Sequence, residues 1–183
     1  MAISCPSCKT HNAATTRLVA TKIEGDLPCL SCANCQGILL SLLSYRNWLE
    51  SHLWFQLDEV DHQPIVEDGK NIKQCPKCER LMIKYQYANE DKLKLDLCAH
   101  CDEIWLDDGE WDFLKFQGLY DKLPKILTEP WQVQLKKAAH EKLRVEKYKQ
   151  LFQQDYTRVN EIKIFIQTNP QREQILDYLR FQD

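Results

Sequence analysis

Apolar and polar positions alternate on both sides of a polar turn at residues 89–91. The apolar members are Ile83, Tyr85, Tyr87, Leu93, Leu95 and Leu97. An apolar residue at every second position is typical of a strand with one buried face. The earlier segment 17–23 is rich in β-forming residues and precedes the turn residues 24–26. The sequence therefore predicts two β-hairpins in the first hundred residues.

The apolar spacing changes to three or four residues after each hairpin, which is typical of a helix. The first predicted helix carries Leu42, Tyr45, Trp48, Leu49 and Leu53, and the second carries Trp111, Leu114 and, more loosely, Leu119. Asp107, with Glu110 three residues later, resembles a capping box at the start of the second helix. Residues 56–74 are polar and acidic, and we expect them to form a solvated linker.

The last third of the chain has a helical pattern throughout. Apolar residues step by three, four or seven from Trp131 to Ile166, which predicts one long helix or two helices broken near Asp155. Pro130 suits a first helical turn, and a short helix follows Pro170. The predicted fold class is thus small α+β, with an all-α C-terminal region at 125–183.

All nine cysteines lie before residue 102, and eight of them form a repeated pattern. Each copy has a Cys-Pro-x-Cys pair and then a Cys-x-x-Cys pair, which defines modules at 1–55 and 75–122. Four thiolates at this spacing suit tetrahedral Zn²⁺, with iron as the lesser alternative. The sequence therefore predicts two structural zinc ions, with the ligands Cys5, Cys8, Cys32, Cys35, Cys75, Cys78, Cys98 and Cys101.

Cys29 leaves the first site with an alternative ligand set. It forms a further Cys-x-x-Cys with Cys32, so it competes with Cys35 for the fourth position. The residues that follow Cys35 match the second copy, which favours Cys35 and leaves Cys29 as a buried thiol. Gly37, two residues after Cys35, is expected to have a positive φ.

The second copy resembles the bacterial zinc ribbons related to the one in transcription factor IIB. The resemblance rests on Cys75-Pro-Lys-Cys-Glu-Arg-Leu-Met and on Cys98-Ala-His-Cys-Asp-Glu-Ile-Trp-Leu-Asp-Asp-Gly-Glu-Trp, and it covers about residues 73–117. Glu103 departs from it by standing where that family has glycine. Residues 3–50 are a degenerate copy. The resemblance implies zinc binding and work associated with transcription or nucleic acid.

The charge of the chain and the closed form of its cysteine sites limit the functions that we expect. The net charge is −3, and residues 125–183 carry 11 basic and 8 acidic side chains, so no segment is strongly basic. This disfavours a nucleic-acid binder, although it does not exclude one, and favours a protein adapter attached to transcription or translation machinery. A thiol-based redox or zinc sensor is a further alternative. A closed four-cysteine site has no vacancy for a substrate, so we expect no enzymatic activity.

The sequence also gives expectations for the cellular location and the partners of the protein. The first residues lack the apolar region of a signal peptide, and no apolar run reaches the roughly 20 residues of a membrane helix. We therefore expect a cytoplasmic protein with no membrane contact. Its predicted partner is another protein, held by the C-terminal helices, and a homo-oligomer remains an open alternative.

Overall fold

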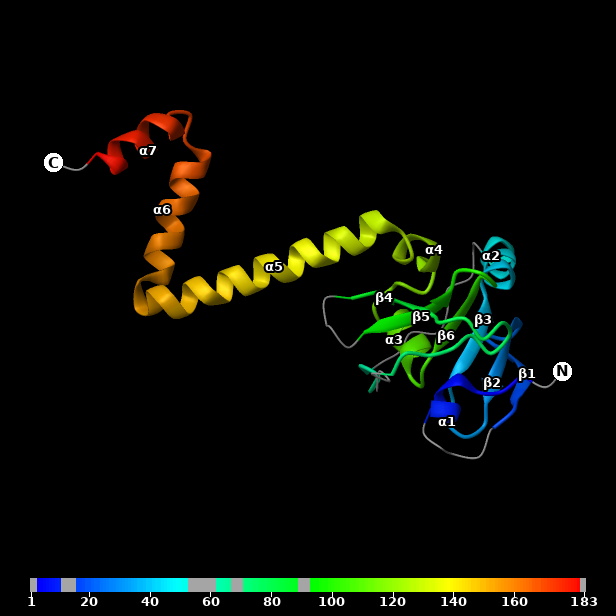
Figure 1. Cartoon of the computed structure of the whole chain (residues 1–183). Helices are drawn as coiled ribbons and strands as arrows, with labels where there is room; N and C mark the ends of the chain where they lie inside the picture. Colours follow the sequence, from blue (N-terminus) through cyan, green and yellow to red (C-terminus); the bar gives the residue numbers. More distant parts are fainter. Residues whose placement is uncertain (1–2, 11–15, 53–61, 67–70, 89–92, 182–183) are drawn as a thin grey trace. The chain divides into compact units, whose positions relative to one another are not determined.

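The computed structural model describes most of the chain (Figure 1), namely residues 3–10, 16–52, 62–66, 71–88 and 93–181. The chain divides into two compact units, Met1–Leu135 and Lys136–Asp183. The first unit contains every strand found in the described ranges, and it contains all nine cysteines. It has the predicted α+β class, because helices pack on an antiparallel sheet.

Six strands form one sheet in the order β1-β2-β3-β6-β5-β4. The strands are β1 (Leu18–Ile23), β2 (Leu27–Cys32), β3 (Ile38–Ser41), β4 (Ile83–Gln86), β5 (Lys94–Cys98) and β6 (Glu103–Leu106). Each neighbouring pair is antiparallel, and β1–β2 and β4–β5 form hairpins. In Figure 1 the blue strands of the first cysteine repeat thus continue directly into the green strands of the second.

The two repeats meet where β3 pairs with β6. Leu39 lies opposite Trp105, and Ile38 and Leu40 lie opposite Leu106 and Ile104. In the alignment of the repeats, Ile38, Leu39 and Leu40 correspond to Ile104, Trp105 and Leu106. The pairing therefore relates β3 and β6 by a local two-fold axis, which passes between Leu39 and Trp105. The two modules share one sheet.

One face of the sheet carries the larger core. Helices α2 (Leu42–Ser51), α3 (Glu110–Phe116) and α4 (Leu123–Ile126) pack here against Ile38, Leu40, Ile104 and Leu106. Ser41 begins α2 by accepting a hydrogen bond from the Ser44 N–H at 3.5 Å. On the opposite face, Leu39 and Trp105 pack with cysteines of both repeats. Successive strand residues point to opposite faces, which separates the two clusters.

The start of α3 differs from the predicted capping box. Gly109 is the N-cap, with a φ of 76°, and no side chain caps the helix there. The Glu110 carboxylate instead accepts a hydrogen bond from the backbone N–H of Asp107 at 2.8 Å, as one half of such a box would. A side chain at Gly109 would also overlap the carbonyl oxygen of Ile65. The Asp107 carboxylate is therefore available for the contacts described below.

The C-terminal helices are α5 (Glu129–Phe152), α6 (Tyr156–Thr168) and α7 (Arg172–Arg180). A 3₁₀ turn at Gln153–Asp155 separates α5 from α6, near the predicted break at Asp155. None of the described residues in these three helices is buried. No helix among the described residues combines the length and apolarity needed to cross a membrane.

The beginning of the predicted C-terminal region belongs with the first unit. Ile126 is fully buried in the main core, and Trp131 packs against it. The end of the predicted linker is also not solvated as expected, because Lys73 is only 2% exposed. Leu53 of the first predicted helix and much of the linker lie outside the described residues.

Candidate metal centres

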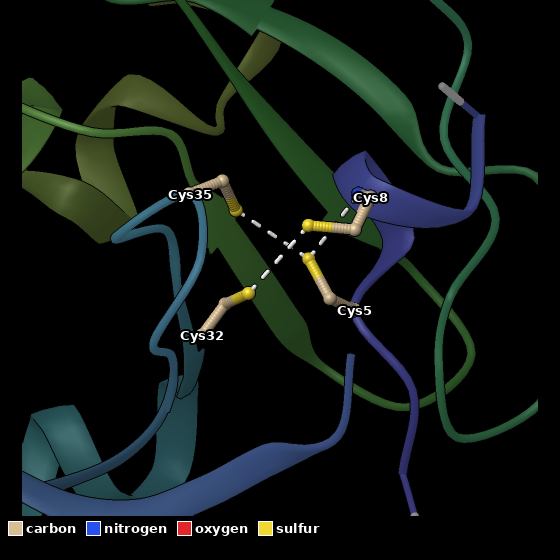
Figure 2. A group of neighbouring side chains, drawn as sticks. All are labelled: Cys5, Cys8, Cys32 and Cys35. Carbon is tan, nitrogen blue, oxygen red and sulfur yellow. Dashed lines mark hydrogen bonds between the residues drawn. The ribbon is translucent and has the colours of Figure 1, made fainter. Parts of the chain in front are cut away.

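The sulfur atoms of Cys5, Cys8, Cys32 and Cys35 converge on one point (Figure 2). Cys5 and Cys8 come from the start of the chain, around α1 (Pro6–Thr10), Cys32 ends β2, and Cys35 lies in the turn before β3. The Cys5 and Cys35 sulfurs are 3.5 Å apart, and those of Cys8 and Cys32 are 3.7 Å apart. All four lie within 4.8 Å of one another, so this group could hold a metal ion.

The second repeat forms an equivalent group from Cys75, Cys78, Cys98 and Cys101, whose sulfurs also lie within 4.8 Å of one another. The Cys78 and Cys98 sulfurs are 3.5 Å apart. Cys98 ends β5, as Cys32 ends β2. The first group has three buried members and the second has two, so the second is more accessible to solvent.

The sulfur separations suit a tetrahedral ion. A Zn–S bond near ~2.3 Å places the corners of a regular tetrahedron roughly 3.8 Å apart. Three of the sulfur–sulfur distances, at 3.5–3.7 Å, are close to that edge, and the others do not exceed 4.8 Å. No disulfide links the cysteines. Each group thus has the ligand type and spacing that a four-thiolate site requires.

The turns that carry the cysteines use a left-handed residue directly after a pair. Glu79, Gln36 and Asp102 follow Cys78, Cys35 and Cys101, and their φ values are 61°, 56° and 53°. The Gln36 N–H donates to the Cys32 carbonyl at 2.9 Å, which closes the turn around the sulfurs. The positive φ expected at Gly37 therefore occurs one residue earlier, at Gln36.

Gly37 has a different role in the structure. A Cβ atom at this position would overlap the indole ring of Trp105. The glycine lets the indole ring of the second repeat approach the turn of the first closely. Glu103 occupies the equivalent position in the second repeat and pairs with Lys77 at 2.5 Å. Space for Trp105, and not backbone conformation, accounts for glycine at position 37.

Cys29 lies on the opposite face of the sheet from the cysteine groups. It is 7% exposed and packs in the main core with the helices. Because it precedes Cys32 by an odd number of residues, the two side chains point to opposite faces of β2. Burial raises the pKa of the Cys29 thiol, as expected for an inert core thiol. The structure brings Cys35, and not Cys29, to the first group.

The cysteines of each group influence one another's protonation. Burial raises the pKa of Cys35 to about 11, whereas at Cys8 the amide of Asn34 and neighbouring thiols outweigh burial and lower the pKa to about 7. In the second group, a backbone hydrogen bond from Arg80 lowers the pKa of Cys78 to about 7, and hydrogen bonding with Cys78 raises that of Cys101 to about 12. One thiolate in each group is thus favoured, and a cation is needed to hold four together.

Asp107 links the two repeats beside the cysteine groups. Its carboxylate accepts hydrogen bonds from Lys73 at 2.7 Å, Trp105 at 2.8 Å and Ser7 at 3.0 Å. Ser7 lies between Cys5 and Cys8, so this carboxylate ties the first cysteine turn to the second repeat. Lys73 also pairs with the buried Asp96 at 2.8 Å. The pKa of Asp107 is lowered because Lys73 outweighs the effect of burial.

Lys73 and Asp96 were not anticipated as functional positions. Lys73 falls in the predicted linker, and Asp96 occupies a polar position in the alternating pattern of its strand, where exposure is expected. The alignment of the two repeats could have indicated Lys73. It lies two residues before Cys75, where the first repeat has Ile3 two residues before Cys5. A charged residue at a position that is apolar in the other copy indicates either exposure or a buried partner.

Comparison of the chain with protein-family models, curated proteins and solved structures finds no match.

Proposed function

We propose that this chain is a non-enzymatic zinc-binding interaction module of the kind that transcription-factor-IIB-type zinc ribbons represent. The two groups of four cysteine sulfurs carry the proposal: the sulfurs of each group lie within 4.8 Å of one another, and three of the pairs are 3.5–3.7 Å apart. The ligands would be the eight cysteines of these groups. Each zinc ion would leave no coordination position for a substrate, so its role would be structural.

The metal-binding role is supported by what surrounds the cysteines. Leu39, Trp105 and Met82 are the buried residues that pack with the cysteine groups, and a cluster this small offers little apolar area. Small ribbons of this kind gain much of their folding free energy from the metal, since a preformed site rarely exists in the unfolded chain. Zinc would therefore hold the cysteine turns against the Leu39–Trp105 contact.

The adapter role is supported by the C-terminal unit. Leu143, Leu151, Ile162 and Phe165 are at least half exposed, so its helices present apolar surface that another protein would cover. The described ion pairs of α5 join Arg144 to Glu141 and Lys149 to Glu146, which dilutes its basic charge. A protein partner, for example in transcription or translation machinery, thus fits better than a phosphate backbone.

Two measurements test the proposal. Elemental analysis of purified protein should find two zinc ions per chain, whereas one zinc or stoichiometric iron would contradict the zinc-module assignment. Affinity purification with the full chain and with residues 1–135, each with and without nuclease, addresses the adapter role. We expect nuclease-resistant protein capture by the full chain alone. A nanomolar complex with one RNA or DNA sequence at physiological salt would instead identify a nucleic-acid-binding ribbon.

A further inference from the structure

The outer edge of β1 leaves backbone groups without partners among the described residues. The Leu18 N–H points away from β2, because it donates to the Ile3 carbonyl at 2.8 Å. Groups that point outward recur at every second residue of an antiparallel strand. The N–H and C=O groups of Ala20 and Lys22 therefore also point outward. No described residue pairs with them there.

The equivalent edge of the second repeat is capped at one position, Gln86. Gln86 in β4 corresponds to Lys22. The Leu18 N–H donates to the Ile3 carbonyl and the Met82 N–H to the Lys73 carbonyl, and Lys22 and Gln86 each lie four residues after these donors. The side-chain amide of Gln132 binds both outward groups of Gln86, at 3.1 Å to the N–H and 2.7 Å to the carbonyl. The outward groups of Gln86 are thus capped, whereas no described residue caps those of Lys22.

A groove of about 530 Å³ adjoins the open edge. Its lining is mainly apolar and includes Ile3, Ala20, Lys22, Pro28, Leu30 and Leu39. In the second repeat, the positions of Ile3 and Leu30 hold Lys73 and Asp96, whose buried ion pair fills the same place. Among the described residues, a buried ion pair in the second repeat thus takes the positions that line the groove in the first.

The charge beside the groove is positive and unpaired. Lys22 is exposed, and no acidic side chain of the described residues pairs with it. Lys77, which also lines the groove, is already paired with Glu103. An added strand would therefore meet an apolar surface opposite Ala20 and a free ammonium group opposite Lys22.

We propose that the β1 edge binds an extended peptide segment of a partner protein, which adds as an antiparallel seventh strand. Main-chain hydrogen bonds to Ala20 and Lys22 would supply affinity, as in other cases of strand addition. Two side chains on the groove face would supply specificity: a carboxylate opposite Lys22 and, two residues later, a branched apolar residue opposite Ala20. This surface is formed by residues of the first unit alone, and the proposal does not depend on the role of the C-terminal helices.

The competing explanation is that Lys22 protects an exposed edge from pairing, as lysine does in many sheets. A capped octapeptide with Glu-Thr-Val at its centre and serine or threonine elsewhere distinguishes the two. Its controls have lysine in place of glutamate, or N-methyl groups on the glutamate and valine nitrogens. The measurement is titration of the full zinc-loaded chain, followed by amide NMR shifts and calorimetry.

We expect one binding site, with shifts at Ala20, Lys22 and Leu30, and no binding of the N-methylated peptide. Lys22→Glu should weaken binding about three- to tenfold and favour the lysine peptide. Ala20→Pro removes only an outward N–H, which an edge strand tolerates, and should abolish binding. Gln132→Ala is the control away from β1 and should not alter the shifts at β1. No binding by the folded chain, or equal binding by the N-methylated peptide, would overturn the proposal and leave Lys22 as edge protection.

Discussion

Leu39 and Trp105 occupy equivalent positions of the two cysteine repeats and lie directly opposite one another in β3 and β6. Both side chains are fully or almost fully buried between the two cysteine groups. Such self-matched pairing is the geometry of a symmetric dimer interface, here formed within one chain. The contact between the repeats and the two candidate metal centres therefore form one structural element.

Replacing Gly37 tests the fit of Trp105. In Gly37→Ala the new methyl group would overlap the indole ring, so we expect a loss of about 1–3 kcal/mol of unfolding free energy. Trp105→Leu installs the residue type of the equivalent position and removes the overlap. Urea denaturation should show that Gly37→Ala lowers the free energy of unfolding much less in the Trp105→Leu background than in the wild-type chain. Equal costs in both backgrounds would contradict the contact.

Two cysteine variants test the composition of the first group. Cys29→Ser should retain two metal ions per chain, because Cys29 packs on the opposite face of the sheet. Cys35→Ser should lose or weaken one, because its sulfur lies 3.5 Å from that of Cys5. Elemental analysis after gel filtration gives the metal count. The reverse outcome would transfer the fourth ligand position to Cys29.

Metal release on acidification should follow from thiol protonation. Cys8 and Cys78 have pKa values lowered to about 7, and those of Cys35 and Cys101 are raised to about 11 and 12 in the metal-free groups. Binding must therefore expel protons, and lower pH should weaken it. Competition with a chromophoric chelator, measured from about pH 8 down to about pH 5, should show a steadily falling affinity of the protein for the metal. A pH-independent affinity would exclude thiolate ligation.

Replacing Asp107 tests the link between the repeats. Asp107→Asn should destabilise the chain by about 1–3 kcal/mol, since Lys73 would retain only Asp96 as a close buried partner. The folded-state pKa of Asp107 lies below its unfolded value, so its contribution is complete above about pH 4 and is lost as the pH falls through the folded pKa.

The difference in unfolding free energy between the wild-type chain and Asp107→Asn should therefore be constant from about pH 5 to 8 and shrink below about pH 4. Ser7→Ala is the matched control, because it removes one neutral partner of the same carboxylate and should cost about 0.5–1.5 kcal/mol. A cost for Asp107→Asn no larger than that of Ser7→Ala would argue against a stabilising ion pair.

Two truncations test where the first unit ends. A chain of residues 1–135 should retain two metal ions and unfold cooperatively, because it keeps Ile126 and Gln132. A chain of residues 1–124 loses the fully buried Ile126 and should be less stable by about 2–5 kcal/mol. Circular dichroism during thermal unfolding compares them. Equal midpoints would show that α4 and the start of α5 add nothing to the core.

The amino-acid sequence alone was sufficient to identify the two groups of four cysteines. Their spacing is a local property, because a two-residue gap places both sulfurs of a pair on one side of a tight turn. The alternation around Tyr85 and Leu95 likewise predicted a hairpin, since one buried face imposes a period of two. The repeat also favoured Cys35 over Cys29, which agrees with where the sulfurs lie.

The tertiary structure decided how the repeats combine. Pairing between Leu39 and Trp105 joins strands far apart in the chain, and periodicity states which face is buried but not which edges meet. The same contact explains Gly37, whose backbone needs no positive φ. Lys73 could be read as a linker residue because only folding brings Asp96 and Asp107 to it. A buried charge becomes stable when distant partners surround it, and no local pattern records those partners.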